Sequence, residues 1–103
     1  MDKKRENELI LLSDRIQEKA HSMVTEYLEK TYAGAGPESM NDQLEDWLYV
    51  TQEATAYLLG NALAVLMPES AEEQIQEAAD RLRTVSTYVR KKRGGESTPE
   101  RVQ

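Results

Sequence analysis

The tripeptide Pro-Glu-Ser occurs twice in this chain, at residues 37–39 and 68–70. Each serine is followed three residues later by an acidic residue, first Asp42 and then Glu73. This spacing predicts a capping box, in which the serine caps the first turn of a helix. The proline ahead of the serine stops a helix that arrives from the N-terminal side, because it disfavours helical geometry in the residue before it. The segments that follow the two copies differ, so we interpret the tripeptides as two helix starts.

These two starts divide the chain into three helices, which we expect at about 5–32, 40–67 and 71–93. Apolar residues recur at spacings of three and four in these segments, and no segment alternates between apolar and polar residues as a strand would. The sequence therefore predicts an all-α fold, an up-down-up three-helix bundle in a single domain at 1–93. The remaining residues, 94–103, have no apolar periodicity and are predicted to be a disordered tail.

All three predicted helices have an amphipathic face that should point into the bundle, and that of the third is formed by Ile75, Ala78, Leu82, Val85 and Val89. In the first helix, the residues of this face are Leu9, Leu12, Ile16, Ala20, Met23 and Tyr27. Those in the first half of the middle helix are Met40, Leu44, Trp47, Leu48 and Thr51.

The second half of the middle helix, at 54–67, carries no charge on any face. A helix that is apolar around its whole circumference is buried on more than one side. It could be the buried centre of a monomer, or it could form a homodimer interface or dock a partner. A row of small residues at four-residue spacing favours the homodimer, since it lets another backbone come close. The predicted dimer-interface residues are Ala56, Tyr57, Gly60, Leu63 and Ala64.

Charge is unevenly distributed along the chain, whose net charge is −6. Residues 31–80 contain ten acidic side chains and no Lys or Arg, whereas residues 81–103 contain seven Lys or Arg and two Glu. This distribution excludes a uniformly basic surface for nucleic acid and favours a bipolar molecule. The acidic residues predicted to bind a partner are Glu38, Asp42, Glu45, Asp46 and Glu53.

The basic cluster at 90–93, Arg-Lys-Lys-Arg, ends the third predicted helix. Such a cluster could contact phosphates without sequence preference. It also complements the negative end of the helix dipole, which is the commoner role of cations at this position. No interleaved aromatic residues or recognition-helix motif accompany it, so nucleic acid is not the partner that we expect.

Metal and thiol chemistry have little support in the sequence. There is no cysteine, so the chain can form no disulfide and no thiolate metal site. Glu18 and His21 have the Glu-x-x-His spacing of di-iron helical bundles, but only a symmetric dimer could supply a second copy. We therefore predict no metal and no cofactor.

Four acidic residues form an E-x-x-E and E-x-x-D pair, namely Glu26 with Glu29 and Glu77 with Asp80. Over these two short motifs the chain resembles the all-helical MazG-like nucleotide pyrophosphohydrolases. The resemblance implies a Mg²⁺ site in which carboxylates from adjacent helices hold the metal against the substrate phosphates. In an up-down-up bundle, however, the two motifs would lie at opposite ends of parallel helices.

The sequence thus predicts a non-enzymatic protein-binding module (an adaptor, regulator or inhibitor) that acts through its acidic stripe on another protein. The alternatives are an acidic inhibitor or nucleic-acid mimic that targets a nucleic-acid-handling protein, and a MazG-like pyrophosphohydrolase. We expect a cytoplasmic protein with no membrane contact. The N-terminus lacks the features of a signal peptide, and the longest uncharged stretch, 54–68, is too short to span a bilayer.

Overall fold

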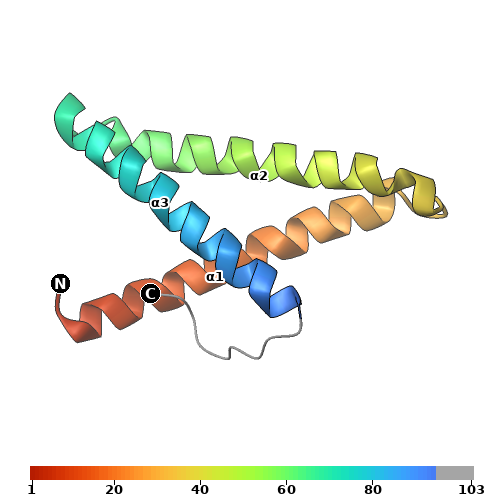
Figure 1. Ribbon diagram of the computed structural model, residues 1–103, viewed down its shortest axis with the longest axis horizontal. Coiled ribbons are helices and arrows are strands. Elements are labelled where there is room, and N and C mark those ends of the chain that lie inside the picture. The colour runs from red at the N-terminus through yellow and green to blue at the C-terminus, as the bar shows by residue number, and fades with distance from the viewer. Residues whose placement is uncertain (95–103) are drawn as a thin grey trace. The chain divides into compact units, whose positions relative to one another are not determined.

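The computed structural model describes residues 1–94, which form helices and no strand (Figure 1). The elements are α1 (Lys3–Thr31), a short 3₁₀ helix η1 (Pro37–Ser39), α2 (Met40–Leu63) and α3 (Pro68–Arg93). The all-α class is confirmed. Apart from Gly94, the predicted tail lies outside the described residues.

The two Pro-Glu-Ser segments start helices, but the predicted capping by serine is wrong. Pro68 is the first residue of α3, and Met67 occupies the cap position without a side-chain hydrogen bond. Proline is favoured at the first helical position, because its fixed φ suits a helix and its missing N–H would have no partner there. Helix α3 therefore begins three residues earlier than predicted, and Pro37 likewise opens η1.

Ser39 stabilises the turn before α2 in a different way. Its hydroxyl donates a hydrogen bond to the Gly36 carbonyl oxygen at 2.8 Å and accepts one from Gln43 Nε2 at 2.9 Å. Ser39 is the only buried residue among residues 1–94. Its short hydrogen bonds fix the direction in which α2 leaves the turn.

The chain divides into two compact units, Met1–Thr55 and Ala56–Gln103, with the boundary inside α2. Unit 1 contains α1, the connecting loop, η1 and the first part of α2. Unit 2 contains the last two turns of α2, a short link and α3. The single domain at residues 1–93 stays a prediction.

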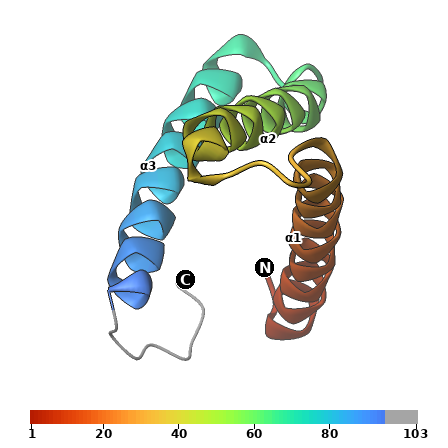
Figure 2. The ribbon, with the colours of Figure 1, turned by 90° about the vertical axis from the view of Figure 1, so that its right-hand side faces the viewer.

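In unit 1, α1 and the first part of α2 form an antiparallel pair (Figure 1). Asp2 caps the start of α1, with its Oδ1 accepting a hydrogen bond from the Arg5 N–H at 2.8 Å. After α1 the chain passes through Gly34, whose φ of +80° belongs to the left-handed region that glycine adopts without strain. Figure 2 shows the loop that carries the chain from α1 across to α2.

In unit 2, the end of α2 packs against the first half of α3. Leu59 and Leu63 of α2 line a cleft together with Gln74 and Ala78 of α3. Helix α2 ends at Leu63, four residues before its predicted end, because the following residues turn into α3.

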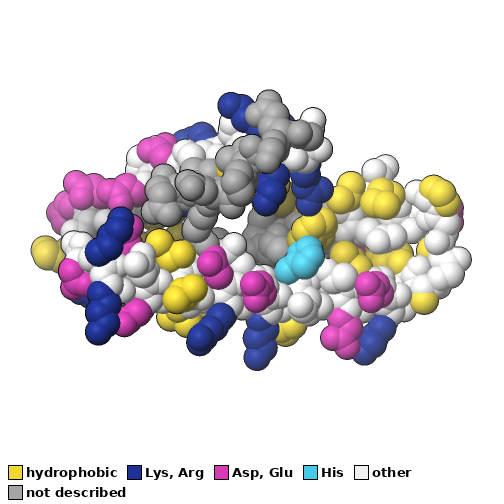
Figure 3. All heavy atoms as spheres, turned by 90° about the horizontal axis from the view of Figure 1, so that it is seen from below, with side chains coloured by type: hydrophobic (Ala, Val, Ile, Leu, Met, Phe, Trp, Pro, Cys, Tyr) yellow, Lys and Arg dark blue, Asp and Glu magenta, His cyan; other side chains and the backbone are white. Residues whose placement is uncertain are grey.

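No apolar side chain in residues 1–94 is buried, so neither unit encloses a hydrophobic core of its own. Figure 3 shows hydrophobic side chains at the surface among the charged ones. Most of the α1 face predicted to point inward is exposed, by 44% at Leu9 to 64% at Met23. In α2, Trp47 and Thr51 are half-buried, whereas the other predicted inward residues are exposed: Met40, Leu44 and Leu48. None of the helices in residues 1–94 has the length and hydrophobicity that a membrane-spanning helix requires.

Candidate functional site

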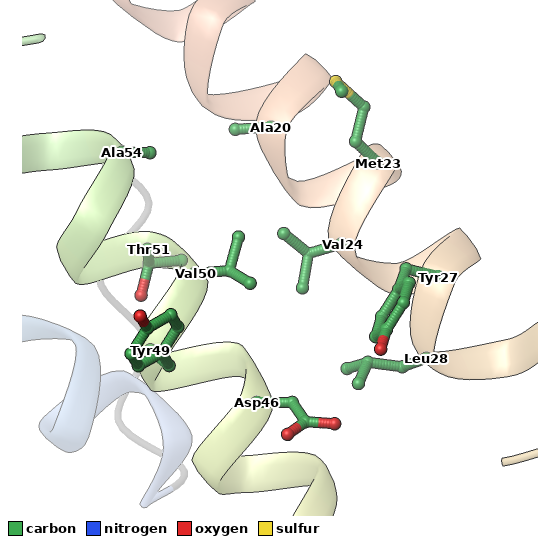
Figure 4. A pocket seen from close by; sticks show the side chains of 10 residues that line it. All are labelled: Ala20, Met23, Val24, Tyr27, Leu28, Asp46, Tyr49, Val50, Thr51 and Ala54. Atoms are coloured by element: carbon green, nitrogen blue, oxygen red, sulfur yellow. The ribbon is translucent and has the colours of Figure 1, made fainter. Parts of the chain in front are cut away.

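The most prominent hollow in unit 1 is an apolar groove of about 520 Å³ between α1 and α2. Val24 of α1 and Val50 of α2 point toward one another across it (Figure 4). Ala20 and Ala54 line one end, where their small side chains leave the groove wide. Because α1 and α2 touch each other along one face only, these apolar side chains remain accessible to solvent or to a partner.

The walls of the groove carry larger side chains. On α1 they are Met23, Tyr27 and Leu28, and on α2 they are Asp46, Tyr49 and Thr51. Tyrosines combine a large apolar ring with a polar tip, which suits a surface that must be exposed in one state and covered in another.

Asp46 is the charged residue in the groove lining, and it is half-buried. The Tyr32 hydroxyl, from the residue that ends α1, donates a hydrogen bond to Asp46 Oδ2 at 2.6 Å. This hydrogen bond, followed by desolvation and by the negative charges of Asp46 and Asp42, raises the pKa of Tyr32 to about 12. The phenol therefore stays neutral and keeps donating to Asp46 at all physiological pH values.

Asp46 belongs to an acidic row along one face of α2. Asp42, Asp46, Tyr49 and Glu53 follow one another at spacings of four, three and four, which places them on the same side of a helix. Asp46 and Tyr49 line the groove, and Asp42 and Glu53 lie on the same face of α2, one turn to either side of them. We call these four residues the acidic rim.

The predicted acidic stripe thus divides into two parts. The acidic rim contains Asp42, Asp46 and Glu53. Glu45 directly precedes Asp46 in the sequence, so it lies on a neighbouring face of α2. Glu38 is engaged in the turn, where its Oε1 accepts a hydrogen bond from the Gly36 N–H at 3.0 Å. The sequence analysis named Asp46 only as a partner-binding residue, and the structure places it half-buried beside α1.

A second, smaller hollow of about 230 Å³ involves other residues of α1 and α2. His21 and Trp47 meet there with ring centroids 6.0 Å apart in an edge-on arrangement. Such aromatic contacts stabilise a packed pair by roughly 0.5–1.5 kcal/mol. His21 therefore contributes to the α1–α2 contact, and no group of three or more potential metal ligands occurs in residues 1–94.

Two of the four carboxylates behind the pyrophosphohydrolase resemblance form ion pairs. Glu26 forms an ion pair with Lys30 at 3.0 Å, and Asp80 forms one with Arg83 at 2.8 Å. Glu29 lines the smaller hollow of unit 1, and Glu77 lines the cleft of unit 2. Each of these ion pairs is exposed and contributes little to stability.

The predicted dimer-interface residues lie around the end of α2. Tyr57 is exposed, and a Cβ added to Gly60 would meet no atom within 4 Å. Ala64 follows the last residue of α2, and its N–H still donates to the Gly60 carbonyl oxygen at 3.0 Å. Leu63 differs from the others, because it lines the cleft against α3.

The sequence analysis missed Val24, Val50 and Ala54 as groove residues. The available signal was that Gln43, Trp47, Val50 and Ala54 recur at spacings of four and three, but the mixed polarity of this face did not distinguish it as a contact face. No protein-family model matches the chain, and neither a curated protein nor a solved structure is significantly similar to it.

The Tyr32–Asp46 hydrogen bond leads to a prediction of how the stability of the fold depends on pH. Because folding raises the pKa of Tyr32, the contact stabilises the fold fully below pH 10, and this contribution is lost as the pH rises through about 12. The measurement is an absorbance titration near 295 nm of the wild type against Tyr32→Phe. The difference should show one tyrosine with a pKa of about 12.

The control is the same difference measured in an Asp46→Asn background. Removing the charge should move the pKa of this tyrosine back toward its ordinary value of 10.0. A tyrosine that titrates at its ordinary value in both backgrounds would show that the contact is not made in solution.

Proposed function

We propose that this protein is a non-enzymatic protein-binding module that takes a helix of its partner into the groove between α1 and α2. The observation that carries the proposal is that the groove is lined mostly by apolar side chains, several of which are exposed: Met23, Tyr27, Tyr49 and Val50. An amphipathic helix that lays its apolar face into such a groove is a common mode of protein recognition.

The size of the groove supports a helix as the occupant. The α1 residues that line it run from Ala20 to Leu28, a rise of about 12 Å or roughly two helical turns. A guest helix would present about two turns of apolar residues to the floor, so Val24 and Val50 would contact it near the centre. Apolar contact supplies most of the binding free energy at the centre of an interface.

The acidic rim supplies selectivity. Asp42, Asp46 and Glu53 lie in a stretch of 50 residues without a Lys or Arg, so their charge is not neutralised by sequence neighbours. A negative rim beside an apolar floor favours partners with Lys or Arg along one flank, and it speeds their association. The acidic residues of the rim are thus the part of the predicted partner-binding stripe that lies beside the groove.

Mutation of the groove floor tests this function. Val50→Asp places a charge on the floor, and it should weaken capture of the partner at least about tenfold because the charge would be desolvated on binding. The matched control is Val65→Asp, which makes the same change at an exposed residue outside the groove. The measurement is capture by tagged protein from a lysate of the producing cells, quantified by mass spectrometry.

Equal capture of the same protein by wild type and Val50→Asp would contradict binding in the groove. It would favour the second candidate function, an acidic inhibitor or nucleic-acid mimic, which rests on the charge of the acidic rim. Such a protein would lose its target in Asp42→Lys/Glu53→Lys and at raised salt, and would keep it in Val50→Asp.

We also propose the two finer features of assembly that the sequence predicts, the up-down-up bundle and the homodimer. The open space beside Gly60 and the exposure of Tyr57 support a contact with another molecule on this face of α2. Leu63 is half-buried and lines the cleft with α3, so less of its side chain is available to that contact. A cytoplasmic location stays a prediction.

Substitution of Gly60 tests the dimer interface. A Cβ added to Gly60 would meet no atom within 4 Å, so Gly60→Leu should keep its helical circular-dichroism signal while the dimer separates. Asn61→Leu is the control, because it introduces the same side chain beside the small-residue row. Light scattering coupled to size-exclusion chromatography gives the molecular mass of each variant. A Gly60→Leu variant that remains a dimer would contradict this interface.

A further inference from the structure

One side of α1 carries a row of exposed apolar side chains along most of the helix. We call it the α1 row, and it consists of Leu9, Leu12, Ile16, Ala20, Met23 and Tyr27. Its five large side chains are 44–64% exposed. The half-buried residues Ile10, Ser13 and Asp14 lie to one side of the row. The α1 row is therefore a surface of its own, and it is accessible to a partner.

The α1 row is straight, and it runs into the groove. Its members follow one another at spacings of three, four, four, three and four, so the pattern returns after 11 residues. An 11-residue repeat follows an α-helix closely, because it corresponds to about 3.67 residues per turn. The row thus extends about 27 Å from Leu9 to Tyr27. Its second half, from Ala20 to Tyr27, lines the groove of unit 1, and its first half lies outside the groove lining.

The α1 row is also symmetric about Glu18. Leu9 and Tyr27 each lie nine residues from this midpoint, and Ile16 and Ala20 each lie two residues from it. Two copies of α1 that pack antiparallel about the midpoint therefore place Leu9 of each on Tyr27 of the other. They also place the bulky Ile16 against Ala20, whose small side chain leaves the groove wide. Glu18 itself lies on the opposite side of α1, so its two copies do not meet.

The charges at the two ends of the α1 row fit this antiparallel register. Arg5 is exposed and precedes Leu9 by four residues, so it extends the row at its first end. The register brings Arg5 beside Thr31 of the other copy. The residue after Thr31, Tyr32, donates its hydrogen bond to Asp46, the charged residue in the groove lining. The guanidinium of one copy thus lies near the groove carboxylate of the other, which favours the antiparallel arrangement.

We propose that the helix bound in the groove is α1 of a second copy of this chain, packed antiparallel about Glu18. Each copy inserts the first half of its α1 row, around Leu12, into the groove of the other. One symmetric interface therefore covers both rows and both grooves. This inference rests on the proposed function of the groove and names the partner. Its residues differ from those of the interface predicted at Gly60, so its test has to locate the contact.

Cysteine cross-linking locates the contact, because the chain has no cysteine of its own. The two variants are Leu9→Cys and Tyr27→Cys, which are oxidised alone and as an equimolar mixture. The mixture should rapidly give dimers joined through positions 9 and 27, as identified by peptide mass spectrometry. Neither variant alone should do so, because its two cysteines would lie about 27 Å apart along the antiparallel pair, too far for a disulfide.

Leu12→Glu tests the contribution of the α1 row to affinity. A glutamate in the row would be desolvated in the groove, so this variant should self-associate at least about tenfold more weakly than its parent. The matched control is Leu11→Glu, the same change at a leucine that is 61% exposed on another side of α1. It should associate like the parent. Both are measured by sedimentation equilibrium in the Gly60→Leu background, so that the interface predicted there does not contribute.

Three results would overturn the α1 pairing. The first is a wild-type chain that stays monomeric at all concentrations. The second is rapid disulfide formation by each cysteine variant alone and none between positions 9 and 27, which would mean a parallel pair. The third is equal dissociation constants of Leu12→Glu and Leu11→Glu, which would place the contact elsewhere. In each case the groove keeps its proposed function if Val50→Asp still weakens capture of another protein.

Discussion

Two helices joined by a short loop can cover each other along one face only. This constraint decides which faces of α1 and α2 stay exposed. In unit 1 the contact between α1 and α2 is fixed at one end by the Tyr32–Asp46 hydrogen bond and by the turn around Ser39. Many apolar side chains stay exposed as a result, among them Met23, Tyr27 and Val50 in the lining of the groove. This exposed apolar surface is where we propose that a partner binds.

Local signals in the sequence were enough to predict the helices. The spacing of apolar residues predicted three helices, and the two Pro-Glu-Ser segments located the starts of α2 and α3 to within three residues. The capping was wrong, because Pro68 enters α3 as its first residue. The difference between a proline before a cap and a proline inside the first turn is small in energy, so residue types alone do not decide it.

The groove could not be predicted in the same way, because it depends on which faces of α1 and α2 meet. Apolar periodicity selected Leu44 and Leu48 as contact residues, yet α2 lines the groove with Asp46 and Val50. From the sequence alone, Asp46 would be taken for a surface residue. In the structure it accepts a hydrogen bond from Tyr32, which is 14 positions away in the chain. Whether Tyr32 and Asp46 meet depends on the angle at which the loop directs α2 back along α1.

The central claim is that the groove is covered when the protein associates, and the four methionines can test it in one experiment. Met23, on the groove wall, is 64% exposed in the single chain, and Met67, outside the groove, is 71% exposed. Peroxide oxidation of the free protein and of the protein with its captured partner, read by peptide mass spectrometry, compares their rates within the same molecule. The account predicts that Met23 becomes selectively protected when the partner is bound. An unchanged ratio of the two oxidation rates with and without the partner would contradict it.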